Sequence, residues 1–153
     1  RRVCDMERSY PLDAVAGAAS MTRAELIARL AAATEGSREL DCDIEIAVHR
    51  CDPSSFYRAS DDLLYWNEPR DFGSTVAFEQ CAQPLPHYTT SLDVALTLVP
   101  NVLGIMWDVV KYPGESAAAY VGQKDIPMRE FSFAKTPVLA LCIAALKATE
   151  AAT

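Results

Sequence analysis

Hydrophobic positions repeat at helical spacing soon after residue 20. Apolar side chains recur from Leu26 to Leu30, and Thr22 with Glu25 has the spacing of a capping box. Gly36 is a typical helix end, since glycine adopts the left-handed conformation readily. This pattern predicts a first helix over residues 22–36.

Two further helices are indicated downstream. Ser37 is a favoured N-cap, and a third helix should start at Thr90 and Asp93, which again have capping-box spacing, and stop before Pro100. The inward positions of the second helix would be Leu40, Ile44, Ala47 and Val48. The first two helices together should form a helical hairpin.

The C-terminal part predicts a β-hairpin followed by a last helix. Residues 102–112 and 117–122 are rich in β-branched and aromatic residues, and Pro113–Gly114 between them is a strong turn signal. Thr136 followed by Pro137 is typical of a helix start, because proline suits the first helical position.

Residues 51–87 and 1–20 lack such periodicity. Prolines and aromatic residues are scattered through 51–87, which predicts an irregular insertion within a single domain spanning residues 21–150. The aromatic residues there either close the end of the core or line a pocket. Residues 1–20 are expected to be a disordered tail, or translation upstream of a natural start at Met21.

Composition fits one globular domain of the α/β class. The chain has 153 residues, of which 50% are hydrophobic and 23% charged. We expect a small antiparallel sheet packed between helices, an α-β-α sandwich. The longest apolar stretch, 137–146, is too short to span a membrane, and no export signal is evident, so we expect a cytoplasmic protein.

The charge of the chain argues against general nucleic-acid binding. The formal net charge is -7, and the excess acids lie mainly in residues 37–87. Such a field repels a phosphate backbone, although a small anionic ligand remains open.

Metal and cofactor sites are not predicted. The five cysteines are an odd number without C-x-x-C spacing, so we expect them to be reduced and mostly buried. His49, Cys51, Cys81 and His87 could assemble a zinc site, but their spacings do not match common zinc motifs.

Catalytic signatures are also missing, which favours a protein that is not an enzyme. His87, Ser91 and Asp93 are close in sequence, but Ser91 and Asp93 fall in a helix first turn, where they satisfy free N–H groups. The pairs Asp61–Asp62 and Asp41–Glu45 could act as acid and base. A solvated acidic face is the simpler interpretation, because acids are abundant there.

The basic residues before the last helix suggest an anion site. Lys124, Arg129 and Lys135 precede Thr136, and helix N-termini attract anions through free N–H groups. Alternatively, they are ordinary solvated bases on a connector.

Residues 88–100 and 136–148 resemble the phage ABA-sandwich domain family, and residues 21–27 look like the start of such proteins. The resemblance covers residues 21–49 and 88–150 and implies a sheet between helices and a phage or prophage origin. Some relatives look like Thoeris anti-defence proteins, which sequester cyclic ADP-ribose signals without catalysis. Residues 51–87 depart from the family, being longer and more acidic.

The resemblance leads to a specific binding hypothesis. Tyr65 and Trp66 would stack on a base, while Arg129 or Lys135, with Thr136, would meet the phosphates of a nucleotide-derived ligand. Contacts in a homo-oligomer could complete that pocket. The rival hypothesis is a phage accessory protein that acts through contacts with host or phage proteins. A small hydrolase using Asp61, Asp62 or His87 is a third.

Overall fold

The computed structural model describes residues 15–16, 21–49, 55–71, 76–101, 104–114, 116–124 and 130–151. Its helices are α1 (Arg23–Ala32), α2 (Arg38–His49), α3 (Leu92–Leu96) and α4 (Pro137–Ala151). The strands form two antiparallel sheets. Sheet A has the order β1 (Val15–Ala16), β2 (Phe56–Arg58), β3 (Leu63–Asp71) and β4 (Val76–Pro84), and sheet B has the order β5 (Ile105–Lys111), β6 (Ala117–Gln123) and β7 (Ser132–Ala134).

Helices α1, α2 and α4 begin where the sequence predicts, because a side chain satisfies the first free N–H groups. At α1, Thr22 Oγ1 accepts from the Glu25 N–H at 3.2 Å and the Glu25 carboxylate accepts from the Thr22 N–H at 2.7 Å, which confirms the capping box. Ser37 Oγ accepts a backbone N–H of α2, and Thr136 Oγ1 accepts one of α4.

Helix α3 differs from its prediction by one residue at the start and by its length. Its N-cap is Ser91 rather than Thr90, since Ser91 Oγ accepts from the Val94 N–H. The Ser91 N–H itself donates to the carbonyl of His87, so a turn precedes the helix. After Leu96 the chain continues in turns, and the helix ends earlier than Pro100 alone would require.

The predicted β-hairpin is confirmed. Strands β5 and β6 pair from Ile105 opposite Gln123 to Lys111 opposite Ala117. The connection contains Gly114 at φ 120°, a conformation that residues with a Cβ rarely adopt. Strand β7 then adds to β6 and completes sheet B.

The prediction of an irregular segment over residues 51–87 is wrong for most of its described part, which contains β2, β3 and β4. Strands β3 and β4 pair from Leu63 opposite Pro84 to Asp71 opposite Val76. Strand β2 reaches only to Tyr65 on the other side of β3, so Pro69 lies where its missing N–H need not break a ladder. Pro69 therefore made β3 hard to recognise in the sequence, although β3 is an edge strand along most of its length.

The predicted tail, residues 1–20, contributes a short strand. Val15 and Ala16 form β1 and pair with Tyr57 and Phe56 of β2. These two residues belong to sheet A, contrary to the expectation that the whole tail stands outside the fold. The rest of residues 1–20 lies outside the described residues.

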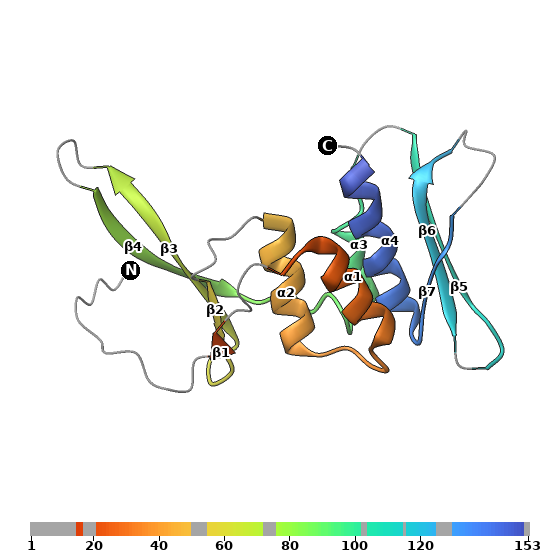
Figure 1. Ribbon diagram of the computed structural model, residues 1–153, viewed down its shortest axis with the longest axis horizontal. Helices are drawn as coiled ribbons and strands as arrows, with labels where there is room; N and C mark the ends of the chain where they lie inside the picture. The colour runs from red at the N-terminus through yellow and green to blue at the C-terminus, as the bar shows by residue number, and fades with distance from the viewer. Residues whose placement is uncertain are drawn as a thin grey trace.

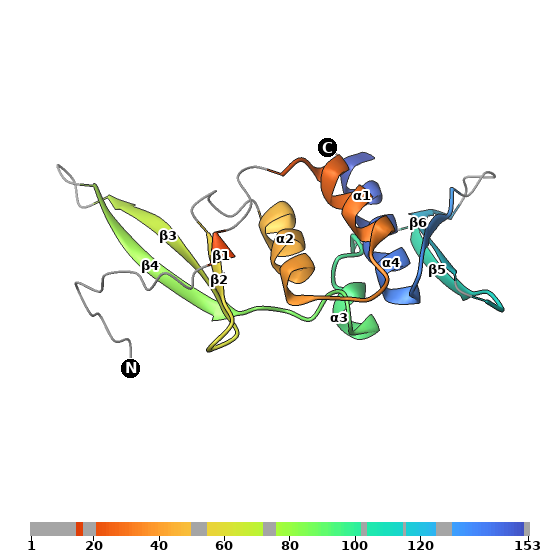
Figure 2. The same ribbon diagram turned by 60° about the horizontal axis from the view of Figure 1, so that its bottom comes forward.

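The α/β class with small antiparallel sheets is confirmed, but the layers are ordered differently from the expected sandwich. Figure 1 and Figure 2 show the helices between the two sheets, with α2 nearest sheet A and α4 against sheet B. No described helix covers the far face of sheet B in these views. The arrangement of a single sheet between helices is thus not confirmed.

Helix α4 explains this order. Every residue from Leu139 to Leu146 is buried, so the helix is apolar on all sides and needs cover around its whole circumference. Sheet B supplies that cover on one side, and α1 and α3 also pack against the helix. Within the described part of the chain, no helix is both long and apolar enough to cross a membrane.

Candidate functional site

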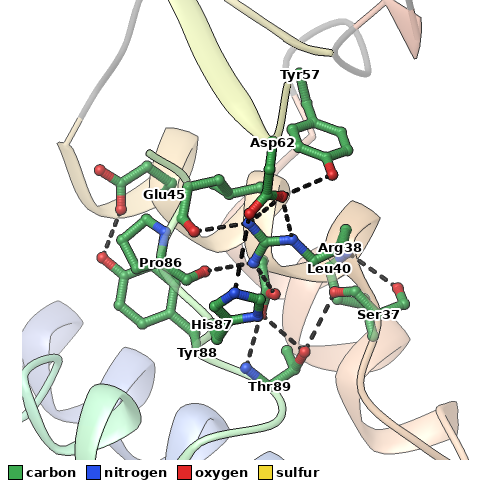
Figure 3. Close-up of polar contacts among 12 residues, drawn as sticks. Ser37, Arg38, Leu40, Glu45, Tyr57, Asp62, Pro86, His87, Tyr88 and Thr89 are labelled. Atoms are coloured by element: carbon green, nitrogen blue, oxygen red, sulfur yellow. Dashed lines mark hydrogen bonds and ion pairs between the residues drawn. The ribbon is translucent and has the colours of Figure 1, made fainter. Parts of the chain in front are cut away.

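Polar side chains gather where α2 meets the base of sheet A (Figure 3). Arg38, Asp41 and Glu45 follow one another at spacings of three and four residues, so they share one face of α2. That face contacts the turn before β3 and the connector after β4. We call this set the Arg38 cluster; its members are Arg38, Asp41, Glu45, Tyr57, Asp62, Gln83, His87, Tyr88 and Thr89.

The Arg38 guanidinium is saturated with acceptors from the protein itself. Its Nε and Nη2 donate to Asp62 Oδ1 at 2.9 and 2.6 Å, and its Nη1 donates to Asp41 Oδ2 at 2.8 Å. Nη2 and Nη1 also reach the carbonyls of Leu85 and Pro86, at 2.7 and 3.0 Å. Each guanidinium nitrogen thus has a partner, which leaves Arg38 little capacity for a ligand.

Asp41 is a fully buried carboxylate whose two oxygens both have donors. Its side chain is 0% exposed, and Oδ1 accepts from the Thr89 N–H at 2.7 Å and from Thr89 Oγ1 at 2.8 Å. Oδ2 faces Arg38. A buried charge is tolerated only when paired and hydrogen-bonded in this way, so Asp41 joins α2 firmly to the connector after β4.

Glu45 forms a second buried junction one turn further along α2. Its Oε1 accepts from Gln83 Nε2 at 2.7 Å, and its Oε2 accepts from the Tyr88 hydroxyl. Burial, with the adjacent Glu45 carboxylate, raises the pKa of Tyr88 well above its usual value. Tyr88 therefore stays protonated and acts as a donor rather than as a base.

Asp62 and His87 form the solvent-facing side of the cluster. Asp62 has a φ of 57°, which places its carboxylate over Arg38 and within reach of the Tyr57 hydroxyl at 2.9 Å. Hydrogen bonding from Arg38 lowers the pKa of Asp62. His87 Nε2 lies 3.9 Å from Asp62 Oδ2, and the His87 side chain is 56% exposed. A carboxylate with a lowered pKa is a weak base, so this pair is better suited to attraction than to proton transfer.

The cluster brings no nucleophile to the Asp62–His87 pair. The Thr89 hydroxyl contacts the Ser37 carbonyl and Asp41, and Ser91 Oγ caps α3 as the sequence predicts. The hydroxyls of Thr89 and Ser91 are therefore engaged in structural hydrogen bonds. The arrangement can fix the base of sheet A to α2, which is a positioning role.

The sequence-predicted ligand residues lie in two places. The Tyr65 hydroxyl donates to Asp61 Oδ2 at 2.7 Å, and the Arg58 guanidinium lies 4.4 Å from the Tyr65 ring centroid. Trp66 is the next residue of β3, so its side chain leaves the opposite face of the sheet.

The basic half of the predicted pocket is elsewhere. Lys135 is exposed after β7, Thr136 caps α4, and Arg129 lies outside the described residues. Figure 1 places β3 and the start of α4 on different sides of the α1–α2 pair. One copy of the chain does not bring Tyr65 and Lys135 together.

The sequence interpretation missed the cluster because it took Asp41 and Glu45 for a solvated face. That interpretation is wrong for both residues, which are 0% and 2% exposed. A signal was available, since both acids lie beside the predicted inward positions Leu40 and Ile44. Arg38 one turn earlier was the cation that such burial requires.

The zinc combination is not assembled in the described part of the chain. Cys51 and the side chain of His49 lie outside the described residues. Among the side chains that are described, no group of three or more His, Cys, Asp and Glu could hold a metal ion. Cys42 and Cys142 are buried, as expected, and Cys81 is partly exposed.

Comparison with known proteins does not assign the chain to a family. No family model matches the chain, and no curated protein or solved structure matches it. The resemblance to phage ABA-sandwich proteins therefore stays a prediction.

Proposed function

We propose that this protein is a non-catalytic binding protein that contacts a partner protein through an arm formed by β3 and β4. The observation that carries the proposal is the reach of these strands. They stay paired from Leu63 to Asp71, beyond the end of β2, and extend away from the helices in Figure 1 and Figure 2. A long two-stranded ribbon gains little stability by itself, so its length calls for another explanation.

The attachment of the arm to α2 also supports a binding role for the arm. At its base, Leu64 and Leu85 are almost fully buried, with Cys42 and Tyr57 beside them. The Arg38 cluster surrounds this small apolar group and ties it to α2. A rigid attachment presents the arm in one orientation, which lowers the entropy lost on binding.

The sequence of the arm indicates the kind of partner. Residues 63–84 contain Glu68, Asp71 and Glu79 against Arg70, within the acidic part of the chain. A partner surface rich in Lys and Arg would be attracted and oriented by this charge. Under the resemblance to phage proteins, such a partner would be a host or phage protein.

The deciding experiment shortens the arm without touching its base. Trp66 and Cys81 lie opposite each other, so residues 67–80 can be replaced by an Asn–Gly turn that preserves the pairing below them. We expect the shortened chain to keep its helices and melting temperature but lose a partner that the full chain captures from host lysate. The captured protein is then purified, and its affinity for both chains is measured by calorimetry.

An Arg58→Met variant, altered beside the base of the arm but keeping its full length, is the matched control and should bind as the full chain does. Equal affinity of the full and shortened chains for every captured protein would refute the proposal.

Sequestration of a nucleotide-type signal is the second candidate. The observation that favours it is the Arg58 guanidinium over the Tyr65 ring, a pairing of positive charge and aromatic surface that suits a phosphorylated base. Because Lys135 and Thr136 lie elsewhere, a second copy would have to supply the remaining groups. Calorimetry with cyclic ADP-ribose isomers tests this candidate. Binding that survives Tyr65→Ala would exclude the Tyr65 site.

A further inference from the structure

Strand β5 is the long edge strand of sheet B and has a row of backbone groups without a partner strand. Sheet B has the order β5, β6, β7, so β6 is the only described strand that pairs with β5. Figure 1 shows β5 on the side of the molecule away from sheet A, with no described helix or strand beyond its outer edge. Such an edge is a ready template for another strand.

The two ends of β5 show which residues face outward. The Tyr112 N–H donates to the Ser116 carbonyl at 3.2 Å, and the Gly104 carbonyl accepts from the Lys124 N–H at 2.9 Å. Backbone groups of successive residues alternate between the two sides of an antiparallel strand. The even-numbered residues therefore bond to β6. The odd-numbered residues, which are Ile105, Trp107, Val109 and Lys111, direct their N–H and C=O groups away from it.

The side chains on this edge are also unusual for a solvent-exposed strand. Trp107 is 46% exposed and Tyr112, just after the strand, is 44% exposed. Lys111 is exposed as well and lies on the same face of the strand as Trp107. Exposed aromatic residues on an open strand edge indicate an interaction surface.

We infer that β5 pairs antiparallel with β5 of a second copy of this chain, with Val109 opposite itself across a two-fold axis. In this register Trp107 of each copy lies opposite Lys111 of the other. An ammonium group then reaches an indole ring on both sides of the axis. The outward backbone groups of Trp107, Val109 and Lys111 all gain partners.

Neighbouring two-fold registers are less favourable. Centring the pair on Asp108 would set two like charges directly opposite each other, which is destabilising. Centring it on Val110 would separate Trp107 from Lys111 and place Trp107 opposite Pro113, which has no N–H to donate. In the register centred on Val109, Pro113 lies opposite Ile105, the first residue of the strand, and both Trp107–Lys111 pairs are kept. The charges and the proline thus select the register centred on Val109, and a second copy fits it because the strand is complementary to itself.

The test measures the mass of the full-length chain by sedimentation over a range of concentrations. We expect a monomer–dimer equilibrium. Val109→Pro removes an outward N–H without touching the bonds to β6, so it should abolish the dimer while the fold is kept. Lys111→Glu alters only a surface side chain and should raise the dissociation constant about tenfold or more.

Phe133→Ala is the matched control. Phe133 is 59% exposed but belongs to β7, at the other edge of sheet B, and its loss should leave the dissociation constant unchanged. A wild-type chain that stays monomeric at every concentration would overturn the inference. So would a dimer that Phe133→Ala dissociates and that Val109→Pro and Lys111→Glu leave intact. Neither result bears on the arm, whose partner is assayed separately.

Discussion

The two sides of the molecule are held together by different interactions. Around α4 the interior is apolar, and the helix contributes buried residues along most of its length. At the base of the arm the apolar interior is small, and α2 adds two buried carboxylates and a partly exposed guanidinium to it. The first region depends on packed volume and the second on the pairing of charges.

This difference matters for function because the two kinds of interior tolerate change differently. An apolar core loses stability gradually as volume is removed. A buried network of charges fails when one partner is removed, because the other charge is left without compensation. The orientation of the arm therefore depends on few residues, whereas the fold around α4 depends on many.

The largest expected effect is in the apolar region. Leu141 is 0% exposed, and Leu141→Ala should lower the free energy of unfolding by about 2–5 kcal/mol through loss of packing and creation of a cavity. Urea unfolding measures this change. Leu92, which is 38% exposed on α3, provides the control, and Leu92→Ala should shift the value by no more than about 0.5 kcal/mol.

The next effect concerns the Arg38 cluster. Arg38→Met keeps the length of the side chain but leaves the buried Asp41 carboxylate without its cation, and should cost about 2–3 kcal/mol. Arg58 and Asp61, each about a third exposed, form a comparable pair near the surface, and Arg58→Met should cost less than about 1 kcal/mol. Equal losses in the two variants would show that the network adds nothing beyond a surface ion pair.

A smaller effect should appear at high pH and report on α4. Burial above all raises the pKa of the Cys142 thiol from 9.0 to about 12, so the folded chain keeps a proton that the unfolded chain releases. Stability should therefore fall as the pH rises, by about 1 kcal/mol between pH 9 and pH 10. The raised pKa of Tyr88 also makes the free energy of unfolding decrease as the pH rises.

Unfolding measured at several pH values checks this prediction. Cys142→Ala should reduce the slope, while Cys81→Ala, at a partly exposed thiol, should keep it. A slope identical in wild type and Cys142→Ala would contradict the assignment to α4.

The smallest effect is expected in acid, at the arm. The hydrogen bond from Arg38 lowers the pKa of Asp62 in the folded chain. The contribution of Asp62 to the free energy of unfolding is therefore fully present above the ordinary carboxyl pKa of 3.8, and it is lost as the pH falls through the lower pKa of the folded chain. Asp62 is 48% exposed, which keeps the effect modest. Hydrogen exchange at low pH should show β2 and the start of β3 opening before α4. If α4 opened first, the base of the arm would not be the more acid-sensitive region, and this prediction would be wrong.

Local features of the sequence determined the helix starts and one hairpin. The Thr22–Glu25 box and the Thr136 cap involve residues at most three positions apart, and the turn at Gly114 needs only its own backbone conformation. Such interactions form within a few residues, so their pattern is visible without knowledge of the rest of the fold.

Tertiary structure alone decided the arm, the order of the layers and the Arg38 cluster. Asp41 meets Thr89 across 48 positions of sequence, and Glu45 meets Tyr88 across 43. Whether an acid on a helix faces water or a buried donor depends on which distant segment packs against it, and no local pattern encodes that segment. Pro69 likewise became compatible with a strand only because β3, beyond Tyr65, pairs with β4 on one side and not with β2 on the other.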